Sequence, residues 1–240
     1  MRSTAIKSAH LWWIACVAVS ALGAEPRIYL WAWDRPEDLR FLEPQIGVAY
    51  FAGEIDLAEK KPAFRPRTKA LLLPKAQPTL PVLHVRAKRS GRYGDAERKV
   101  ILEAIRRLVA DSSTEAIQLD FEVYNSQRDF YKGLIRSIKE ENPNLKLSVT
   151  ALASWCARDA WLKDISVTEI VPMLFDPSHK NGDARHALPQ ASNCKAAVGI
   201  ATYESYRDFP RAETYYIFSN RAWRREDVMR MLALIHENYR

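Results

Sequence analysis

Short apolar stretches alternate with amphipathic stretches along most of the chain, and this alternation constrains the fold more than any other feature. Strands that alternate with helices along a sequence pair as a parallel sheet, because each helix returns the chain to the same edge. The strand-like stretches are 27–33, 47–51, 80–86, 116–122, 145–152, 169–175, 195–203 and 214–219. Apolar residues recur at helical spacing over 95–111, 127–141, 157–165 and 225–239.

Eight strands in a chain of 240 residues predict a compact (β/α)₈ barrel, an α/β TIM-barrel fold. The stretch 54–78 has no helical pattern and is rich in Pro, Lys and Arg, so we expect an irregular barrel there. The alternative is an open, doubly wound parallel sheet. A dinucleotide-binding version of that sheet is disfavoured, because no GxGxxG motif follows a strand. No boundary of a second domain is evident.

The first 24 residues have the pattern of a secretory signal peptide. Arg2 and Lys7 precede an uncharged apolar run over 11–24 that ends in small residues. The run is about 14 residues long, shorter than the roughly 20 that span a bilayer as a helix. We therefore predict cleavage, export to the periplasm or the exterior, and a single mature domain over 25–240. The alternative is a membrane anchor, either an uncleaved signal or a lipidated Cys16.

Charge and motifs exclude several classes of function. The net charge of +7 falls to +5 when Arg2 and Lys7 are removed. In an exported protein, this modest charge argues against a nucleic-acid partner. The sequence has no HExxH, paired CxxC, EF-hand loop or GxSxG, so we expect no metal ion, no cofactor and no serine nucleophile. We expect a monomer without a stable membrane span.

The segment 115–122, Glu-Ala-Ile-Gln-Leu-Asp-Phe-Glu, is polar where a barrel strand should be apolar. Side chains alternate along a strand, so Gln118, Asp120 and Glu122 share a face that would point into the barrel. Glu122 would lie at the carboxyl end, where barrel active sites lie. Two buried carboxylates repel, which raises the pKa of one and suits a general acid. The alternative is a structural ion pair in which Arg86 neutralises the carboxylates.

This segment is similar to the DxxDxDxE signature on the fourth strand of glycoside hydrolase family 18, the chitinase-like TIM barrels. VPMLFD at 171–176 and VGIATY at 198–203 resemble that family's MxYD and G[IV]PxY segments, in the same order. QLDFE, LSVTAL with Trp155 behind it, VPMLF and IFSNRAW also resemble an uncharacterised bacterial family of exported, glycoside-hydrolase-like TIM barrels. That resemblance covers most of the mature chain but implies no particular activity.

The resemblance to family 18 implies that Glu122 is the general acid and that Asp120 positions an N-acetyl group. Glu115 and Gln118 depart from the signature, which has Asp at both positions. Phe175 stands where the family has Tyr, so the hydroxyl that would hold the acetamide is missing. Substrate-assisted cleavage of chitin is therefore disfavoured. Another glycosidic bond, or carbohydrate or cell-envelope binding without cleavage, fits equally well.

A two-carboxylate mechanism needs a second group across the sugar. Asp176, just past a strand, is the candidate, and its alternative role is to form the turn before Pro177. Aromatic side chains at strand ends would stack on sugar rings, whereas Tyr29 and Trp31 are expected in the core. The expected carbohydrate-contacting residues are Gln118, Trp33, Arg86, His84, Trp155, Met173, Phe175, Tyr203 and Trp223.

Two further features have competing interpretations. Cys156 and Cys194 remain after cleavage, and an oxidising compartment favours one disulfide between them. The predicted topology places them at opposite ends of the barrel, whereas a disulfide needs Cα atoms within about 7 Å. We therefore expect two separate thiols. The basic loop 88–92 would attract a polyanion, although a solvated loop is the commoner explanation.

Overall fold

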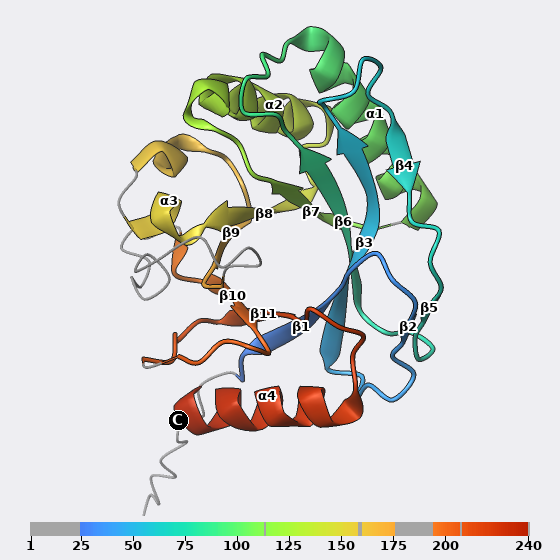
Figure 1. Ribbon diagram of the computed structural model, residues 1–240, viewed down its shortest axis with the longest axis vertical. Coiled ribbons are helices and arrows are strands. Elements are labelled where there is room, and N and C mark those ends of the chain that lie inside the picture. Colours follow the sequence, from blue (N-terminus) through green and yellow to red (C-terminus); the bar gives the residue numbers. More distant parts are fainter. Residues whose placement is uncertain (1–24, 113, 158–159, 176–193, 207, 240) are drawn as a thin grey trace, which may run out of the picture.

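The computed structural model describes residues 25–112, 114–157, 160–175, 194–206 and 208–239. These residues form a closed barrel of eight parallel strands with helices on its outside (Figure 1). The α/β TIM-barrel prediction is confirmed. The open-sheet alternative is wrong, because the first strand pairs with strands on both of its sides and closes the ring. The predicted signal peptide over 1–24 lies outside the described residues.

The barrel strands follow one another around the ring in chain order, and β1 pairs with both β11 and β3. They are β1 (Arg27–Ala32), β3 (Ile46–Asp56), β6 (Thr79–Arg86), β7 (Ala116–Phe121), β8 (Lys146–Leu152), β9 (Glu169–Met173), β10 (Ala197–Ala201) and β11 (Thr214–Phe218). The helices are α1 (Asp95–Ser112), η1 (Asn125–Gln127), α2 (Arg128–Glu141), α3 (Ala153–Ala157), η2 (Ala160–Asp164) and α4 (Arg225–Tyr239).

The predicted irregularity over 54–78 is confirmed. Between β3 and β6 the chain forms no helix, and β4 (Phe64–Pro66) instead pairs antiparallel with the end of β3. β5 (Leu71–Leu72) pairs with β2 (Glu37–Asp38) in a small second sheet. The Pro-rich composition explains this, because proline cannot continue a helix.

The helix predicted over 157–165 is found only in part. The 3₁₀ helix η2 lies within that range, and a separate short helix, α3, begins at Ala153 directly after β8. Trp155 and Trp161 both turn toward the core and pack edge to face, with ring centroids 5.1 Å apart. Burial of these two large rings, rather than the spacing of the smaller apolar residues, sets the path of this connection.

Helices cover the barrel on two opposite sides (Figure 1). α1 and α2 pack their apolar faces on the outside of β6, β7 and β8. α4 packs through Val228, Met231 and Ile235 on the outside of β1, β10 and β11. No helix among the described residues is long and apolar enough to cross a membrane.

The barrel interior is filled by large aromatic rings set against glycine. Tyr29 stacks on Tyr216 with ring centroids 5.1 Å apart, and Trp31 stacks on the other side of that ring at 5.3 Å. A Cβ atom on Gly199 would lie 2.9 Å from the Trp31 ring, and one on Gly47 would overlap the Tyr29 ring. These two glycines therefore leave the room that the rings occupy.

Replacing Gly199 by alanine should therefore destabilise the barrel. We expect Gly199→Ala to lower the free energy of unfolding by about 1–3 kcal/mol, because the added methyl overpacks a rigid ring. Gly133→Ala in α2 is the matched control, since its Cβ would meet only the flexible end of Arg98 from α1. The control should be neutral or stabilising by up to about 1 kcal/mol. Urea denaturation of the purified variants measures both, and equal values would contradict this packing account.

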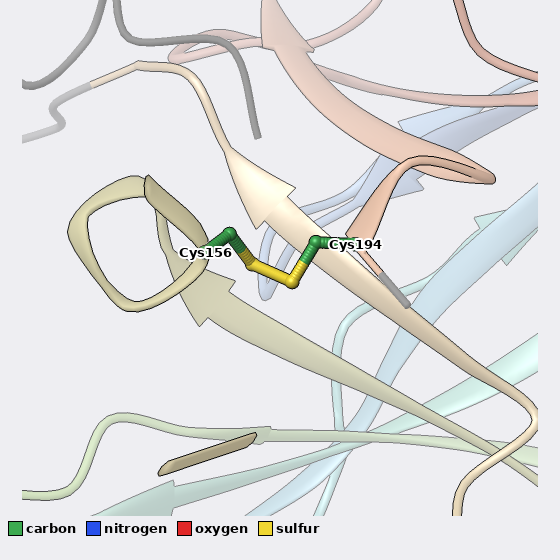
Figure 2. The surroundings of a disulfide bond; sticks show 2 residues. All are labelled: Cys156 and Cys194. Atoms are coloured by element: carbon green, nitrogen blue, oxygen red, sulfur yellow. A yellow bond between two sulfur atoms is a disulfide. The ribbon is translucent and has the colours of Figure 1, made fainter. Parts of the chain in front are cut away.

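Cys156 and Cys194 form a disulfide, with Cα atoms 5.9 Å apart (Figure 2). The prediction of two separate thiols is wrong. It treated the residues after β8 as part of the barrel top, whereas α3 packs against β8 and β9. Cys156 therefore lies on the outer side of the barrel wall, next to Cys194, which precedes the start of β10. Both cysteines are buried in the cluster under α1 and α2.

Peptide mapping under non-reducing conditions should recover a linked Cys156–Cys194 peptide. The bond closes a 38-residue separation, for which the loss of unfolded-state entropy predicts about 4 kcal/mol of stabilisation. The double variant Cys156→Ala/Cys194→Ala should unfold at correspondingly lower denaturant. Reduced wild-type protein is the control and should match the variant. If reduction leaves the wild-type midpoint unchanged, the bond contributes no stability.

Candidate functional site

A cavity of about 270 Å³ opens at the carboxyl ends of the barrel strands. This volume is close to the lower end of the roughly 300–1,000 Å³ typical of small-molecule sites. Active sites of TIM barrels occupy this end of the barrel. The cavity combines two carboxylates, an imidazole and a hydroxyl with an aromatic wall. Its lining residues are Trp31, Trp33, Val82, His84, Asp120, Glu122, Thr150, Met173, Phe175 and Phe218.

Asp120 forms the polar base of the cavity and is buried in the barrel interior. Its Oδ2 lies 2.8 Å from Nδ1 of His84 on the neighbouring strand β6. Its Oδ1 accepts a hydrogen bond of 2.6 Å from the hydroxyl of Thr150 on β8. Three adjacent strands therefore bring one carboxylate, one imidazole and one hydroxyl together, because each presents the same inward face at this level.

The two charged partners stabilise each other's ionised forms. Burial by itself raises the pKa of Asp120, but the hydrogen bond and charge of His84 and the hydrogen bond from Thr150 outweigh it and lower this pKa. Burial by itself lowers the pKa of His84, but Asp120 outweighs it, and Glu54 and Glu122 add to the same effect. The pKa of His84 is thus raised. The pair therefore favours the ionised form of Asp120 and the protonated form of His84.

Glu122 lies at the rim of the cavity. β7 ends at Phe121, so Glu122 is exposed, whereas Asp120 two residues earlier is buried. The expectation that both carboxylates are buried and repel each other is wrong in this respect. The pKa of Asp120 is lowered by His84, not raised by a second carboxylate. The cavity wall thus carries the carboxylate of Asp120 at its base and the accessible carboxyl group of Glu122 at its rim.

Aromatic rings form the apolar wall of the cavity. Phe175 stacks on Phe218 with centroids 5.2 Å apart and planes 2° apart, and it meets Trp31 edge-on at 6.0 Å. Trp33, which is half-buried, meets the His84 ring edge-on at 5.3 Å. No hydroxyl is present on the Phe175 ring. Aromatic surfaces of this kind suit the apolar face of a sugar ring.

His84, not Arg86, forms the ion pair with the carboxylate of Asp120. Arg86 is exposed at the end of β6, and its nearest acidic partner is Asp56 at 3.6 Å. It does not line the cavity, and the ion pair proposed between Arg86 and the β7 carboxylates is wrong. The reason is strand length, because β6 and β3 both extend past the level of Asp120 and carry Arg86 with them.

Gln118 lies below the cavity, where it positions Trp31. Its Oε1 accepts a hydrogen bond of 2.6 Å from Nε1 of Trp31, and its Nε2 donates to Ser148 at 3.0 Å. Gln118 is fully buried and does not line the cavity. The sequence predicted that Gln118 points into the barrel, but its role is to hold the tryptophan that forms the cavity floor.

Three aromatic residues expected at the mouth do not line the cavity. Trp155 is buried beside the disulfide and lines a neighbouring groove instead. Trp223 is buried under α4 and donates from Nε1 to the carbonyl of Trp31 at 2.9 Å. Tyr203 packs edge-on against Phe218, with centroids 6.3 Å apart. Asp176 lies outside the described residues.

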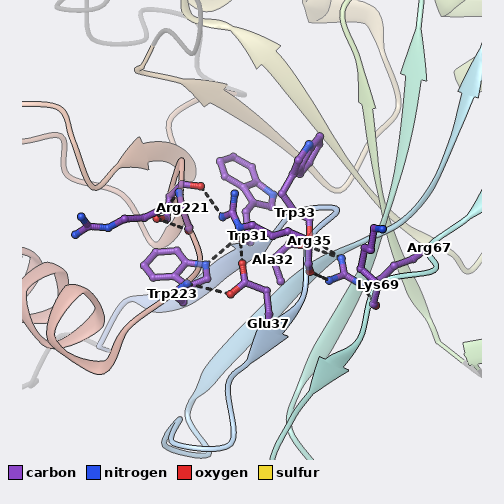
Figure 3. A network of polar contacts seen from close by, with 10 residues as sticks. Trp31, Ala32, Trp33, Arg35, Glu37, Arg67, Lys69, Arg221 and Trp223 are labelled. Carbon is purple, nitrogen blue, oxygen red and sulfur yellow. Dashed lines mark hydrogen bonds and ion pairs between the residues drawn. The ribbon is translucent and has the colours of Figure 1, made fainter.

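An arginine network fixes the end of β1 and the tryptophans that it carries (Figure 3). Arg67 donates to the carbonyls of Trp33 at 2.6 Å and Arg35 at 2.5 Å, from the connection between β3 and β6. Arg35 donates to the buried Glu37 at 2.6 Å, which also accepts from the backbone N–H of Trp223 at 2.9 Å. In place of a helix, this irregular connection therefore supplies a polar side chain whose hydrogen bonds hold the end of β1.

Sequence reasoning missed Thr150, Val82 and Phe218, and it assigned Trp31 to the core alone. Thr150 carried a usable signal, since Ser148 and Thr150 form an inward polar row on β8 like that on β7. Phe218 and Val82 carried none, because apolar strand residues fit the core equally well.

Comparison with known protein families gave no match, and no curated protein sequence matches the chain. The interpretation of the cavity therefore depends on its own geometry. Within the described ranges, no group of three or more His, Cys, Asp and Glu side chains is arranged to hold a metal ion.

The His84–Asp120 pair should make stability depend on pH. The folded pKa of His84 is raised above its ordinary 6.5, so the folded state binds the extra proton and stability falls as pH rises from 6.5 through that pKa. The limiting slope is about 1.4 kcal/mol per pH unit. The contribution of Asp120 is present above pH 3.8 and is lost as pH falls through its lowered pKa.

His84→Gln should remove the alkaline part of this dependence, measured as the urea midpoint across pH 5 to 9. His236→Gln, on the exposed side of α4, is the control and should retain it. A wild-type midpoint that is flat above pH 6.5 would show that the pair is not ionised.

Proposed function

We propose that this protein cleaves a glycosidic bond at the mouth of its barrel, with Glu122 as the general acid. The observation that carries the proposal is the arrangement of the cavity wall. An accessible carboxyl group lies two residues above a buried carboxylate that His84 and Thr150 hold ionised. The similarity of the β7 segment to the signature of glycoside hydrolase family 18 supports the same assignment.

The reaction requires a proton for the leaving oxygen and a negative charge that stabilises the developing positive charge on the sugar. Glu122 donates its proton to the glycosidic oxygen as the bond from that oxygen to the anomeric carbon breaks. Asp120 stabilises the positive charge that develops on the sugar, and it is already ionised before substrate binds. Water then supplies the oxygen that bonds to the anomeric carbon, and its released proton returns to Glu122.

Aromatic surfaces would position the sugar for this step. The Phe175–Phe218 stack and Trp33 line the same cavity as the carboxylates. The volume of about 270 Å³ suits one sugar ring with its neighbours outside. This supports action on a chain end or on a distorted internal unit, with the rest of the glycan lying across the mouth.

We further propose that the protein functions outside the cytoplasm. The signal-peptide pattern over 1–24 supports export, with cleavage after Gly23 or Ala24. The Cys156–Cys194 disulfide supports it independently, because such bonds persist in oxidising compartments and are rare in the cytosol.

A second candidate function is carbohydrate binding without cleavage. Phe175 favours it, because the ring at this position lines the cavity and has no hydroxyl to hold a reacting acetamide. Both candidates use the same cavity, and they differ in whether turnover is detectable.

Glu122→Gln should separate them. In a screen of poly- and oligosaccharides, we expect wild-type turnover that Glu122→Gln lowers by about 10²- to 10⁴-fold, the usual contribution of a general acid. Folding and substrate binding should persist, since Glu122 is exposed. The control is Glu115→Gln, at the opposite end of the same strand, where the side chain pairs with Lys146 at 3.3 Å. Equal turnover in wild type and Glu122→Gln would exclude this mechanism, and no turnover on any substrate would favour binding alone.

A further inference from the structure

A groove adjoins the cavity at Glu122. It has a volume of about 670 Å³, and its lining includes Val123 and Leu152. Val123 follows Glu122 in the chain, and Leu152 shares the inward face of β8 with Thr150 of the cavity. The groove therefore begins where the cavity ends, on the other side of Glu122.

A second cleft of about 730 Å³ continues this groove. The two share Arg89 and Ser126 as lining residues, so they meet between the loop after β6 and the η1 turn. Together they form a path from Glu122 along the mouth of the barrel and out over the start of α1 and α2. We refer to both clefts together as the arginine groove.

The arginine groove has an excess of positive charge, although Arg98 is paired with Asp95 at 2.9 Å. Its lining contains four arginines and a single carboxylate, that of Asp129. The part beside Glu122 contains no acidic lining residue, and among the described residues no carboxylate pairs with Arg89. The four arginines are Arg89, Arg92, Arg98 and Arg128.

The loop that carries two of these arginines is held in place. Gln127 is buried, and its Nε2 donates to the carbonyls of Lys88 at 2.8 Å and Gly91 at 3.1 Å. The hydroxyl of Tyr93 accepts from the backbone N–H of Lys88 at 2.7 Å. A loop fixed in this way loses less entropy when it binds, which is how preorganised sites gain affinity.

An exposed aromatic ring lies within the arginine groove. Tyr124 is 41% exposed, one of few large apolar side chains on the described surface. The Arg89 guanidinium lies over its ring at 5.9 Å, and that of Arg128 lies over Trp161 at 5.0 Å. Planar guanidinium groups bind carboxylates and sulfates in two-point contacts, and an exposed ring stacks on a sugar face.

We propose that the arginine groove binds an anionic polysaccharide, one that carries carboxylate or sulfate groups, and passes it across Glu122 into the cavity. This inference deepens the proposed function, on which it depends for the identity of the ligand as a carbohydrate. Arg89 and Arg128 bind the anionic groups on the units that precede the scissile bond, and Tyr124 stacks on a sugar ring between them.

Affinity electrophoresis and calorimetry of the full mature protein test this. The probes are polygalacturonate for carboxylates, dextran sulfate for sulfates and dextran as the neutral polymer. We expect binding to one or both anionic polymers, weakened by added salt, and none to dextran. Arg89→Gln and Arg128→Gln should each weaken binding by about twofold to fivefold, the range of one exposed ion pair.

Arg107→Gln is the matched control, because this exposed arginine lies in the last turns of α1, at the opposite end of the barrel. Equal losses in Arg107→Gln and Arg89→Gln, or equal binding of dextran, would overturn the inference. Binding only to a single-stranded oligonucleotide or to vesicles of anionic phospholipid would overturn it as well.

The outcome is separable from that of the proposed function. Glu122→Gln should keep its affinity for the anionic polymer. If the polymer binds through Arg89 and Arg128 but no bond is cleaved, the inference holds and the proposed hydrolysis fails. If neutral glycans are cleaved with no effect of the arginine variants, the hydrolysis holds and the inference fails.

Discussion

The closing of the ring by β1 is the constraint on which the rest of the structure depends. β1 pairs with β3 on one side and β11 on the other, and only then do the eight inward faces enclose a common interior. That interior must be filled without voids, and here Tyr29, Trp31 and Tyr216 fill it against two glycines. Trp31 is both the top of this packed layer and the floor of the cavity, so the core and the site share one side chain.

The cavity can hold a buried charge because its neighbours compensate for the lost solvation. An isolated buried carboxylate costs several kcal/mol, and Asp120 avoids this cost through His84 and Thr150 on the two adjacent strands. Glu122 lies past the end of β7, where its side chain is exposed to water. β7 and the residue that follows it thus supply a carboxylate whose ionised form is favoured and an accessible carboxyl group, a division of roles that suits acid-assisted cleavage of a sugar.

Much of this site was predictable from strand alternation. Asp120, Glu122, His84, Trp33, Met173 and Phe175 were all expected at the mouth and all line the cavity. The errors have one cause, which is the uncertainty of where each strand ends in space. Arg86 was considered as a partner of the carboxylates because it lies on the neighbouring strand, but His84 is the β6 residue level with Asp120. The disulfide was disfavoured because Cys156 and Cys194 were expected at opposite ends of the barrel, whereas α3, which carries Cys156, packs against β8 and β9.

The sequence by itself determined the fold class and the polar row on β7, because both follow from local periodicity that needs no knowledge of distant contacts. Only the tertiary structure decided that His84 pairs with Asp120, that Cys156 meets Cys194, and that the arginine groove opens beside Glu122. These contacts join segments far apart in the chain. Their geometry depends on the shear and closure of the barrel, which set the height of each side chain relative to its neighbours.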